Sequence, residues 1–167
     1  MIEEKNTEPY ILEDDEDHRD WIEAALKKAG IWPYSMFANS NDLLGKFTRD
    51  HYLLVLDLRL SENRDGAEVV KEVRDINPDA YIIIISGQNE PKVFIQLIKI
   101  KANDYVDKNN KGWLDELVIS IKSGREDVIK KLNEKEQKAQ LIQELQAIRD
   151  DISERRKKRT NDTGPNN

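Results

Sequence analysis

The sequence contains no cysteine among its 167 residues. Disulfide bonds and every cysteine-based metal or nucleophile site are therefore excluded. The first ten residues, MIEEKNTEPY, lack the basic and apolar segments of a signal peptide, and no apolar run approaches the ~18 residues that cross a membrane. We therefore expect a soluble, cytoplasmic protein.

Apolar residues are scarce and charged residues abundant, at 38% and 36% of the chain. Typical globular domains contain about 45–50% and about 25% of these classes. Part of the chain is therefore expected to be a solvated helix or tail instead of core. Since the length corresponds to about one domain, we expect neither a second catalytic domain nor a second folded output domain.

The net charge of −6 is distributed unevenly along the chain. Residues up to about 110 are strongly acidic, whereas the remaining residues are slightly basic and include the cluster RRKKR at 155–159. An acidic body disfavours binding to nucleic acid. The basic cluster fits a solvated helix end whose cations suit the helix dipole, and contact with phosphates stays open as the alternative.

Short apolar runs alternate with helix-like segments from residue 9 to about 122, which is the pattern of an α/β domain with a parallel sheet. The runs LLVL and YIIII do not alternate with polar residues, so they predict central strands. Right-handed crossovers then favour a doubly wound five-stranded sheet with its ligand site at the carboxyl ends of the strands. The expected strands are Tyr10–Leu12, Trp32–Phe37, Tyr52–Leu56, Tyr81–Ile85 and Asp104–Val106.

The C-terminal part, residues 125–159, contains no glycine or proline and many strong helix formers, which predicts a long exposed helix. Ser123 with Glu126 resembles a capping box. Gly124 therefore marks either a break after the preceding helix or a glycine within one long helix, and both alternatives stay open.

Four apolar residues of this helix, Leu141, Leu145, Ile148 and Ile152, follow the 4-3-4 spacing of a coiled-coil seam. The seam covers about two heptads, where three or four are usual. A homodimer through the seam and packing of the helix onto another partner or onto the domain both stay open. The sequence thus divides into an N-terminal tail (1–8), the α/β domain (9–123), the helical extension (124–159) and a disordered tail (160–167).

Acidic residues follow the first expected strand and end the third. Glu13 and Asp14 belong to the run EDDED, and Asp57 ends the run YLLVL. Because the carboxyl ends of parallel strands share one edge of the sheet, these side chains are expected to converge. Carboxylate oxygens suit a hard divalent ion, so the sequence predicts a Mg²⁺ site.

A hydroxyl and an ammonium group reach the same edge, because Ser86 ends the fourth strand and Lys108 follows the fifth. Lys108 and the metal would offset the charge of a phosphoryl group, Ser86 would donate a hydrogen bond to it, and a carboxylate oxygen of Asp57 would attack phosphorus in line. Each residue alone has a structural explanation, so the prediction depends on their joint occurrence. His18 and His51 show no metal or phosphotransfer pattern and are expected to be structural or solvated.

Residues 9 to about 122 resemble the receiver domain of bacterial two-component response regulators. The resemblance rests on YILEDDEDHR at 10–19, LLVLDLRL at 53–60, DGAEVVKEVR at 65–74, IIIISG at 82–87 and ANDYVDK at 102–108. It implies a flavodoxin-like strand order 2-1-3-4-5. It also implies a regulator that takes a phosphoryl group from a histidine kinase or phosphotransfer protein and signals to an output protein through protein contacts.

The resemblance further assigns roles to single residues. Phosphorylation in the family draws the switch residues toward the phosphoryl group and remodels the surface of the fourth helix, fifth strand and fifth helix. The spacing of six residues between Glu13 and Arg19 favours Glu13 with Asp14 as the acidic pair over a pair with Asp15. The implied roles are Asp57 as phosphoacceptor, Glu13, Asp14 and the Arg59 carbonyl as metal ligands, Ser86 and Tyr105 as switch residues, and Lys108 as the lysine of the site.

The chain departs from the family pattern near the site. Ser61 stands where proline is usual, and Gly66 lies one residue further from Asp57 than is common. Asn109 replaces the proline that usually follows the lysine in a cis peptide, which is much costlier without proline. Because the acids, hydroxyl and lysine are all present, we still expect a working phosphoacceptor.

Other functions make different demands on the residues. A phosphorylation-independent scaffold or dimerisation module would keep this site without being phosphorylated. A metal-dependent phosphohydrolase with an aspartyl-phosphate intermediate usually carries a second aspartate two residues after the nucleophile, where this chain has Arg59. A flavodoxin-like electron carrier would need a phosphate cradle after the first strand, where the carboxylates repel phosphate. We therefore expect a signalling domain and no metabolic enzyme.

Overall fold

The computed structural model of the chain describes residues 4–61, 65–87 and 91–161. Five parallel strands form one sheet in the order β2-β1-β3-β4-β5. This confirms the predicted fold class and strand order. The elements are α1 (Glu4–Thr7), β1 (Pro9–Leu12), α2 (Glu16–Lys28), β2 (Ser35–Phe37), α3 (Ser40–Lys46), β3 (Leu53–Asp57), α4 (Gly66–Ile76), β4 (Tyr81–Ser86), α5 (Pro91–Ile100), β5 (Asp104–Asp107) and α6 (Trp113–Asn161).

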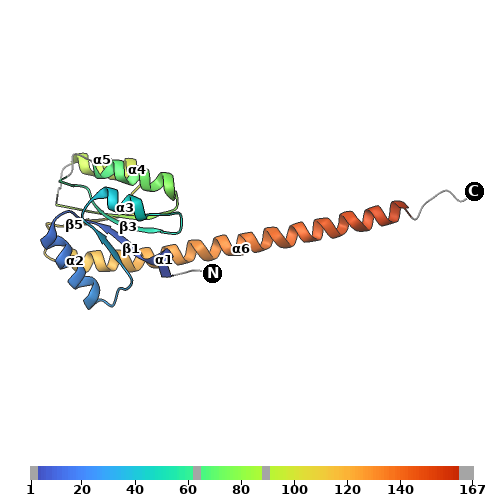
Figure 1. Cartoon of the computed structure of the whole chain (residues 1–167), viewed down its shortest axis with the longest axis horizontal. Coiled ribbons are helices and arrows are strands. Elements are labelled where there is room, and N and C mark those ends of the chain that lie inside the picture. Colours follow the sequence, from blue (N-terminus) through green and yellow to red (C-terminus); the bar gives the residue numbers. More distant parts are fainter. Residues whose placement is uncertain (1–3, 62–64, 88–90, 162–167) are drawn as a thin grey trace, which may run out of the picture. The chain divides into compact units, whose positions relative to one another are not determined.

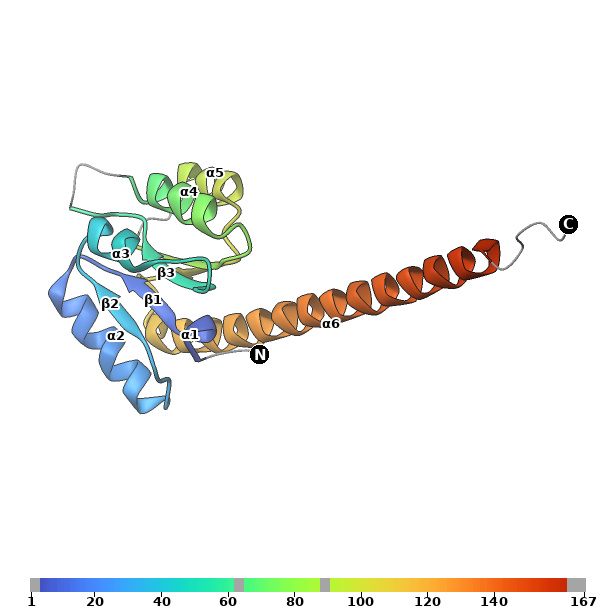
Figure 2. The same ribbon diagram turned by 45° about the vertical axis from the view of Figure 1, so that its right-hand side comes forward.

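Helices cover both faces of the sheet. Figure 1 shows α3, α4 and α5 on one face and α2 with the first turns of α6 on the other, and Figure 2 shows the same layers after rotation. Successive residues of β3 serve opposite cores, because side chains alternate along a strand. Leu54 and Leu56 pack in the core that includes Val69 of α4, whereas Leu53 and Val55 pack in the core that includes Ile22 of α2.

The strands differ from their predicted ranges mainly at one edge of the sheet. β2 begins at Ser35 and excludes Trp32, whose side chain is 73% exposed. Pro33 has no N–H to donate to a neighbouring strand, which explains why the pairing starts after it. β3 extends through Asp57, so the predicted phosphoacceptor is itself the last residue of the strand.

Helix α2 begins at Glu16, directly after the acidic pair and Asp15. Asp15 is its N-cap, and its side chain accepts a hydrogen bond from the N–H of His18. Glu16 and Asp17 lie in the first turn and interact favourably with the helix dipole. Asp15, the residue after the acidic pair, thus caps the N-terminus of the helix that follows β1.

Helix α6 passes through Gly124 without a break, so the alternative of one long helix is the one observed. A Cβ atom at Gly124 would lie 2.8 Å from Cδ1 of Leu53 and 2.9 Å from Cδ1 of Tyr81. Glycine therefore allows the helix to approach β3 and β4 closely, and Ser123 does not cap a new helix.

The chain divides into two compact units, of which the first ends at Lys130 and the second begins at Lys131. Within the predicted N-terminal tail, residues 4–7 form α1, and the side chain of Asn6 donates to the carbonyl oxygen of Asp50 at 2.8 Å. Within the predicted C-terminal tail, residues 160 and 161 belong to α6, and residues 162–167 lie outside the described part. None of the helices in the described ranges is long and apolar enough to cross a membrane.

Candidate functional site

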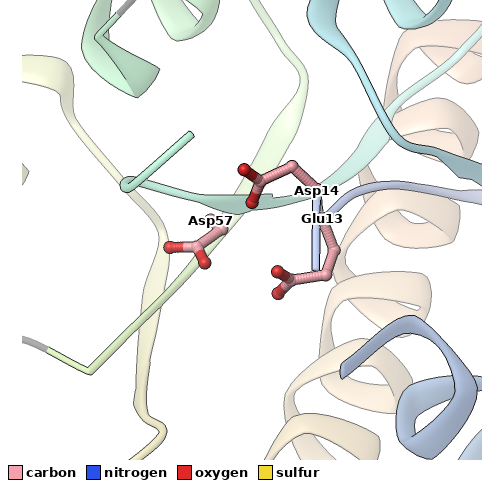
Figure 3. Close-up of side chains that lie close together, drawn as sticks. All are labelled: Glu13, Asp14 and Asp57. Atoms are coloured by element: carbon pink, nitrogen blue, oxygen red, sulfur yellow. The ribbon is translucent and has the colours of Figure 1, made fainter. Parts of the chain in front are cut away.

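Three carboxylates converge at the carboxyl edge of the sheet, as the sequence predicts. Glu13 and Asp14 follow β1, and Asp57 ends β3, which is paired with β1. One carboxylate oxygen of each residue lies within 4.8 Å of the others. Figure 3 shows the three side chains drawn together at the ends of the two strands. Oxygen donors so arranged fit a hard divalent cation such as Mg²⁺.

The ammonium group of Lys108 is held between two of these carboxylates. Its Nζ atom lies 2.5 Å from Oε2 of Glu13 and 2.5 Å from Oδ2 of Asp57. The other oxygen of Asp57, Oδ1, accepts a hydrogen bond from the N–H of Arg59 at 2.9 Å. Both oxygens of Asp57 are therefore bonded, which fixes the orientation of the carboxylate.

The two adjacent acids have opposite pKa shifts. Glu13 is fully buried, and this burial raises the pKa of its carboxyl group although Lys108 acts to lower it. Burial also acts to raise the pKa of Asp14, but the hydrogen bond from the N–H of Ser61 to Oδ2, at 2.5 Å, contributes to a net pKa below its ordinary value. Glu13 is thus the carboxyl group that burial disfavours as an anion, and Asp14 is the one that hydrogen bonding keeps ionised.

The two predicted switch residues lie on neighbouring strands. Ser86 ends β4 and is buried, and its carbonyl oxygen accepts a hydrogen bond from the N–H of Lys108 at 3.0 Å. The hydroxyl of Tyr105, on β5, donates to the same carbonyl oxygen at 3.5 Å. Burial and the nearby Asp107 raise the pKa of this phenol. Ser86 and Tyr105 are therefore linked through the backbone at the end of β4.

An open cavity of about 580 Å³ lies over the acids. Its lining includes the three carboxylates with Arg59 and Lys108, whereas at the end of β4 it is Gly87 that lines it. A cation and a phosphoryl group both need access from solvent, and this cavity gives them access to Asp57. The chemistry that the arrangement allows is attack by an Asp57 oxygen on a phosphorus atom, with the charge offset by Lys108.

Comparison with known proteins decides the family. The sequence profile described as the response regulator receiver domain matches residues 10–122. The chain belongs to the response regulator receiver domain family. Receiver domains of this family are signalling domains of two-component response regulators.

Individual relatives agree with this assignment. The transcriptional regulatory protein CssR of Bacillus subtilis is 27% identical over 99 residues, which cover 59% of this chain and 43% of that protein. A putative response regulator NtrX-like protein of Rickettsia bellii is 34% identical over 116 residues, 67% of this chain and 23% of that protein. The chain thus spans about half or less of the length of these relatives.

Solved structures agree on the fold. A response regulator receiver domain protein (CheY-like) from Methanospirillum hungatei superposes with a TM-score of 0.64 at 18% identity. The alignment covers 74% of this chain and 97% of that one. The five-stranded sheet with its covering helices is therefore a receiver fold.

At the two positions where the family usually has proline, this chain has Ser61 and Asn109, and both residues donate hydrogen bonds. Ser61 donates its N–H to Asp14, a bond that proline could not make. The side-chain amide of Asn109 donates to the carbonyl oxygen of Gly87 at 2.8 Å and to Oδ1 of Asp107 at 2.9 Å. The first bond joins the loop after β3 to the loop after β1, and the bond to Gly87 joins the loop after β5 to the loop after β4. The extra loop residue before Gly66 falls near residues 62–64, which lie outside the described part.

The structure also places His18 in the receiver site, although its sequence context predicts a structural or solvated histidine. Its Nδ1 atom lies 3.2 Å from Nζ of Lys108 and 3.5 Å from Oε1 of Glu13. Its ring contacts the rings of Trp21 and Trp113, at centroid distances of 5.3 and 6.0 Å. The available signal was its position in the first turn of the helix that begins directly after the acids.

Arg19 holds the loop that carries the acidic pair. Its Nη1 atom donates to the carbonyl oxygens of Glu13, at 2.9 Å, and Asp14, at 2.7 Å. The spacing of six residues that favours this acidic pair thus corresponds to a contact that orients the backbone of both acids. Asp15 caps α2 instead.

Proposed function

We propose that this receiver domain accepts one phosphoryl group on Asp57 from a histidine kinase or phosphotransfer protein and signals through protein contacts. The observation that carries the proposal is the position of the Lys108 ammonium group, 2.5 Å from oxygens of both Asp57 and Glu13. A lysine so placed can balance the charge of an incoming phosphoryl group while keeping the nucleophile oriented.

The proposed metal ligands are Glu13, Asp14, Asp57 and the backbone carbonyl of Arg59. The three carboxylates lie close enough together to bind one ion, and their oxygens are the donors that Mg²⁺ prefers. A bound Mg²⁺ ion would supply positive charge against the phosphoryl oxygens. Asp14 is the acid best prepared for this role, because the hydrogen bond from Ser61 helps to keep its pKa low.

The phosphoryl transfer itself needs few protein groups. An Asp57 oxygen attacks phosphorus, and the bond from phosphorus to the donor nitrogen or oxygen breaks in line with the new one. The ammonium group of Lys108 then pairs with a phosphoryl oxygen in place of a carboxylate. The hydroxyl of Ser86 donates to another phosphoryl oxygen.

The proposed readout runs from Ser86 to Tyr105. The hydroxyl of Tyr105 contacts the carbonyl oxygen of Ser86, so a movement of the end of β4 toward the phosphoryl group changes the environment of the tyrosine. The ring packs against a core whose partly buried members include Leu97 of α5. A displacement of the ring would therefore alter the α5 and β5 surface that partners contact.

We also propose that the chain acts in the cytoplasm as a receiver domain followed by a helical extension, whose predicted boundary between residues 123 and 124 lies within the continuous helix α6. No metabolite is turned over in this account, since Arg59 stands where phosphohydrolases carry an acid. The domain assists only its own phosphorylation and dephosphorylation. The acidic body of the domain argues against nucleic acid as its direct partner.

The proposal is tested by intact-mass measurement after incubation with Mg²⁺ and a small acyl phosphate. We expect the mass of one phosphoryl group on the wild-type chain and none on Asp57→Asn or in EDTA. Asp75→Asn, an aspartate of α4 away from the cavity, is the matched control and should be phosphorylated like the wild type. Equal phosphorylation of Asp57→Asn would contradict the assignment. If the wild type takes up no phosphoryl group and does not bind beryllofluoride, the domain is a phosphorylation-independent scaffold.

A further inference from the structure

The C-terminal part of α6 is the orange to red segment in Figure 2. Four apolar residues of this part follow coiled-coil spacing. Leu141, Leu145, Ile148 and Ile152, here called the seam, are 55%, 57%, 57% and 46% exposed. Their 4-3-4 spacing places them on one side of the helix. The described residues that surround the seam from 133 to 159 are exposed as well. A stripe of large aliphatic side chains in such a polar helix predicts burial against another helix.

The heptad positions follow from the spacing. Leu141 and Ile148 occupy position d, and Leu145 and Ile152 occupy position a. The flanking g positions are then Glu144 and Asp151, and the flanking e positions include Arg149 and Arg156. The acids therefore lie along one side of the seam and the arginines along the other.

These charges discriminate between the two orientations of a helix pair. In a parallel pair, each g residue faces the e residue five positions later on the other helix. Glu144 would then face Arg149 of the second copy, and Asp151 would face Arg156. In an antiparallel pair, g faces g and e faces e. With residue 141 opposite residue 152, Glu144 would then face Asp151, and Arg149 would face Ile142 in place of an acid.

The residues that end the seam fix the register. Lys138 occupies the a position before Leu141, and Arg155 occupies the d position after Ile152. A shift by one heptad would place these cations against aliphatic side chains and leave half of the seam uncovered. Arg155 keeps a partner on its own helix, since its Nε atom lies 2.9 Å from Oδ2 of Asp151.

We propose that the seam binds a second copy of this chain as a parallel, in-register, two-stranded coiled coil, with Glu144–Arg149 and Asp151–Arg156 pairs between the two helices. The inference does not depend on phosphorylation of Asp57. The seam covers only two heptads, so the association is expected to be reversible and to depend on concentration.

The first test is sedimentation equilibrium of the full chain up to about 100 µM. We expect a monomer–dimer equilibrium that is lost in Leu145→Asp and kept in Gln143→Asp, which changes the opposite side of the helix. Circular dichroism verifies that both variants keep their helix. The proposal is overturned if the wild-type chain stays monomeric or forms a larger oligomer. It is also overturned if the Leu145→Asp variant dimerises as strongly as the wild type.

Orientation is tested by disulfide cross-linking, which the absence of native cysteine makes unambiguous. In a parallel, in-register pair, Leu141→Cys lies opposite itself and should cross-link with itself far faster than Gln143→Cys does. In an antiparallel pair, residue 141 lies opposite residue 152 instead. Cross-linking of Leu141→Cys only when mixed with Ile152→Cys would therefore overturn the parallel arrangement.

The proposed charge pairs are tested by reversing the charges at the e or the g positions. The double variants Arg149→Glu/Arg156→Glu and Glu144→Arg/Asp151→Arg should each weaken self-association by about tenfold or more, because like charges then face each other. Mixing the two variants should restore dimers as heterodimers. Unchanged self-association of either variant would show that these residues do not lie across the seam from each other.

Discussion

The ammonium nitrogen of Lys108 lies 2.5 Å from Oδ2 of Asp57. The lysine side chain is only 7% exposed and also contacts the fully buried carboxylate of Glu13. It therefore balances two carboxylates in the absence of metal, and it belongs to the stability of the domain as well as to the proposed transfer.

Replacing Lys108 by methionine should destabilise the metal-free domain by about 3 kcal/mol, because removal of one partner leaves buried carboxylates uncompensated. Mg²⁺ should then stabilise the variant more than the wild type, since a cation can replace the lost charge. Urea unfolding with EDTA or Mg²⁺ measures both effects. Lys111→Met, a change of an exposed lysine nearby, is the control. Equal stabilisation of variant and wild type by Mg²⁺ would contradict this role of Lys108.

Glu13 should make the metal-free domain lose stability as the pH rises. Burial raises its pKa above the ordinary value of 4.5, so between these two values the folded state holds more protons than the unfolded state. The unfolding free energy therefore falls as the pH rises through the pKa that Glu13 has in the folded state. The stabilisation that Glu13 contributes is complete only below pH 4.5, its ordinary pKa. The test measures the unfolding free energy of the wild type and of Glu13→Gln in EDTA, from below pH 4.5 upward, and asks whether it falls with pH in the wild type only. Glu134→Gln, at an exposed position of α6, should keep the wild-type slope, and a slope unchanged in Glu13→Gln would refute the assignment.

Gly124→Ala should destabilise the domain by about 1–3 kcal/mol, although alanine is the better helix former. Its methyl group would overlap Leu53 and Tyr81, at 2.8 and 2.9 Å. Gly45→Ala is the matched control, because Gly45 also lies in a helix and has no atom within 4 Å of an added Cβ. It should be neutral or stabilising. Equal effects in thermal unfolding would show that close packing is not the reason for Gly124.

Asn109→Ala should slow phosphorylation several-fold, because it removes the side-chain contacts between the loop after β5 and the loop after β4. The variant loses side-chain bonds to Gly87 and Asp107 and, on this basis, about 1 kcal/mol of unfolding free energy. Asn110→Ala, the neighbouring exposed amide, serves as the control. The rate of mass increase with a small acyl phosphate provides the measurement, and a wild-type rate in Asn109→Ala would exclude a positioning role.

The fold and the convergence of the acids were predictable because both follow from local rules. Continuous apolar runs identify central parallel strands, and such strands bring their carboxyl ends to one edge. The remaining features depend on tertiary contacts. The sequence leaves Gly124 as either a helix break or a glycine within one long helix, and its close approach to β3 and β4 decides between them. His18 lies beside Lys108 only because α2 and β5 meet at the same edge of the sheet. The amide of Asn109 likewise bonds to Gly87, a residue far away in sequence.

The most direct test of the central assignment is chemical mapping of the phosphorylated residue. The domain is phosphorylated with a small acyl phosphate and Mg²⁺, reduced with borohydride and digested, and the peptides are sequenced by mass spectrometry. An aspartyl phosphate is reduced to homoserine, so the account predicts homoserine at position 57 and at no other aspartate. Homoserine at another position, or phosphorylation that resists reduction, would contradict the account.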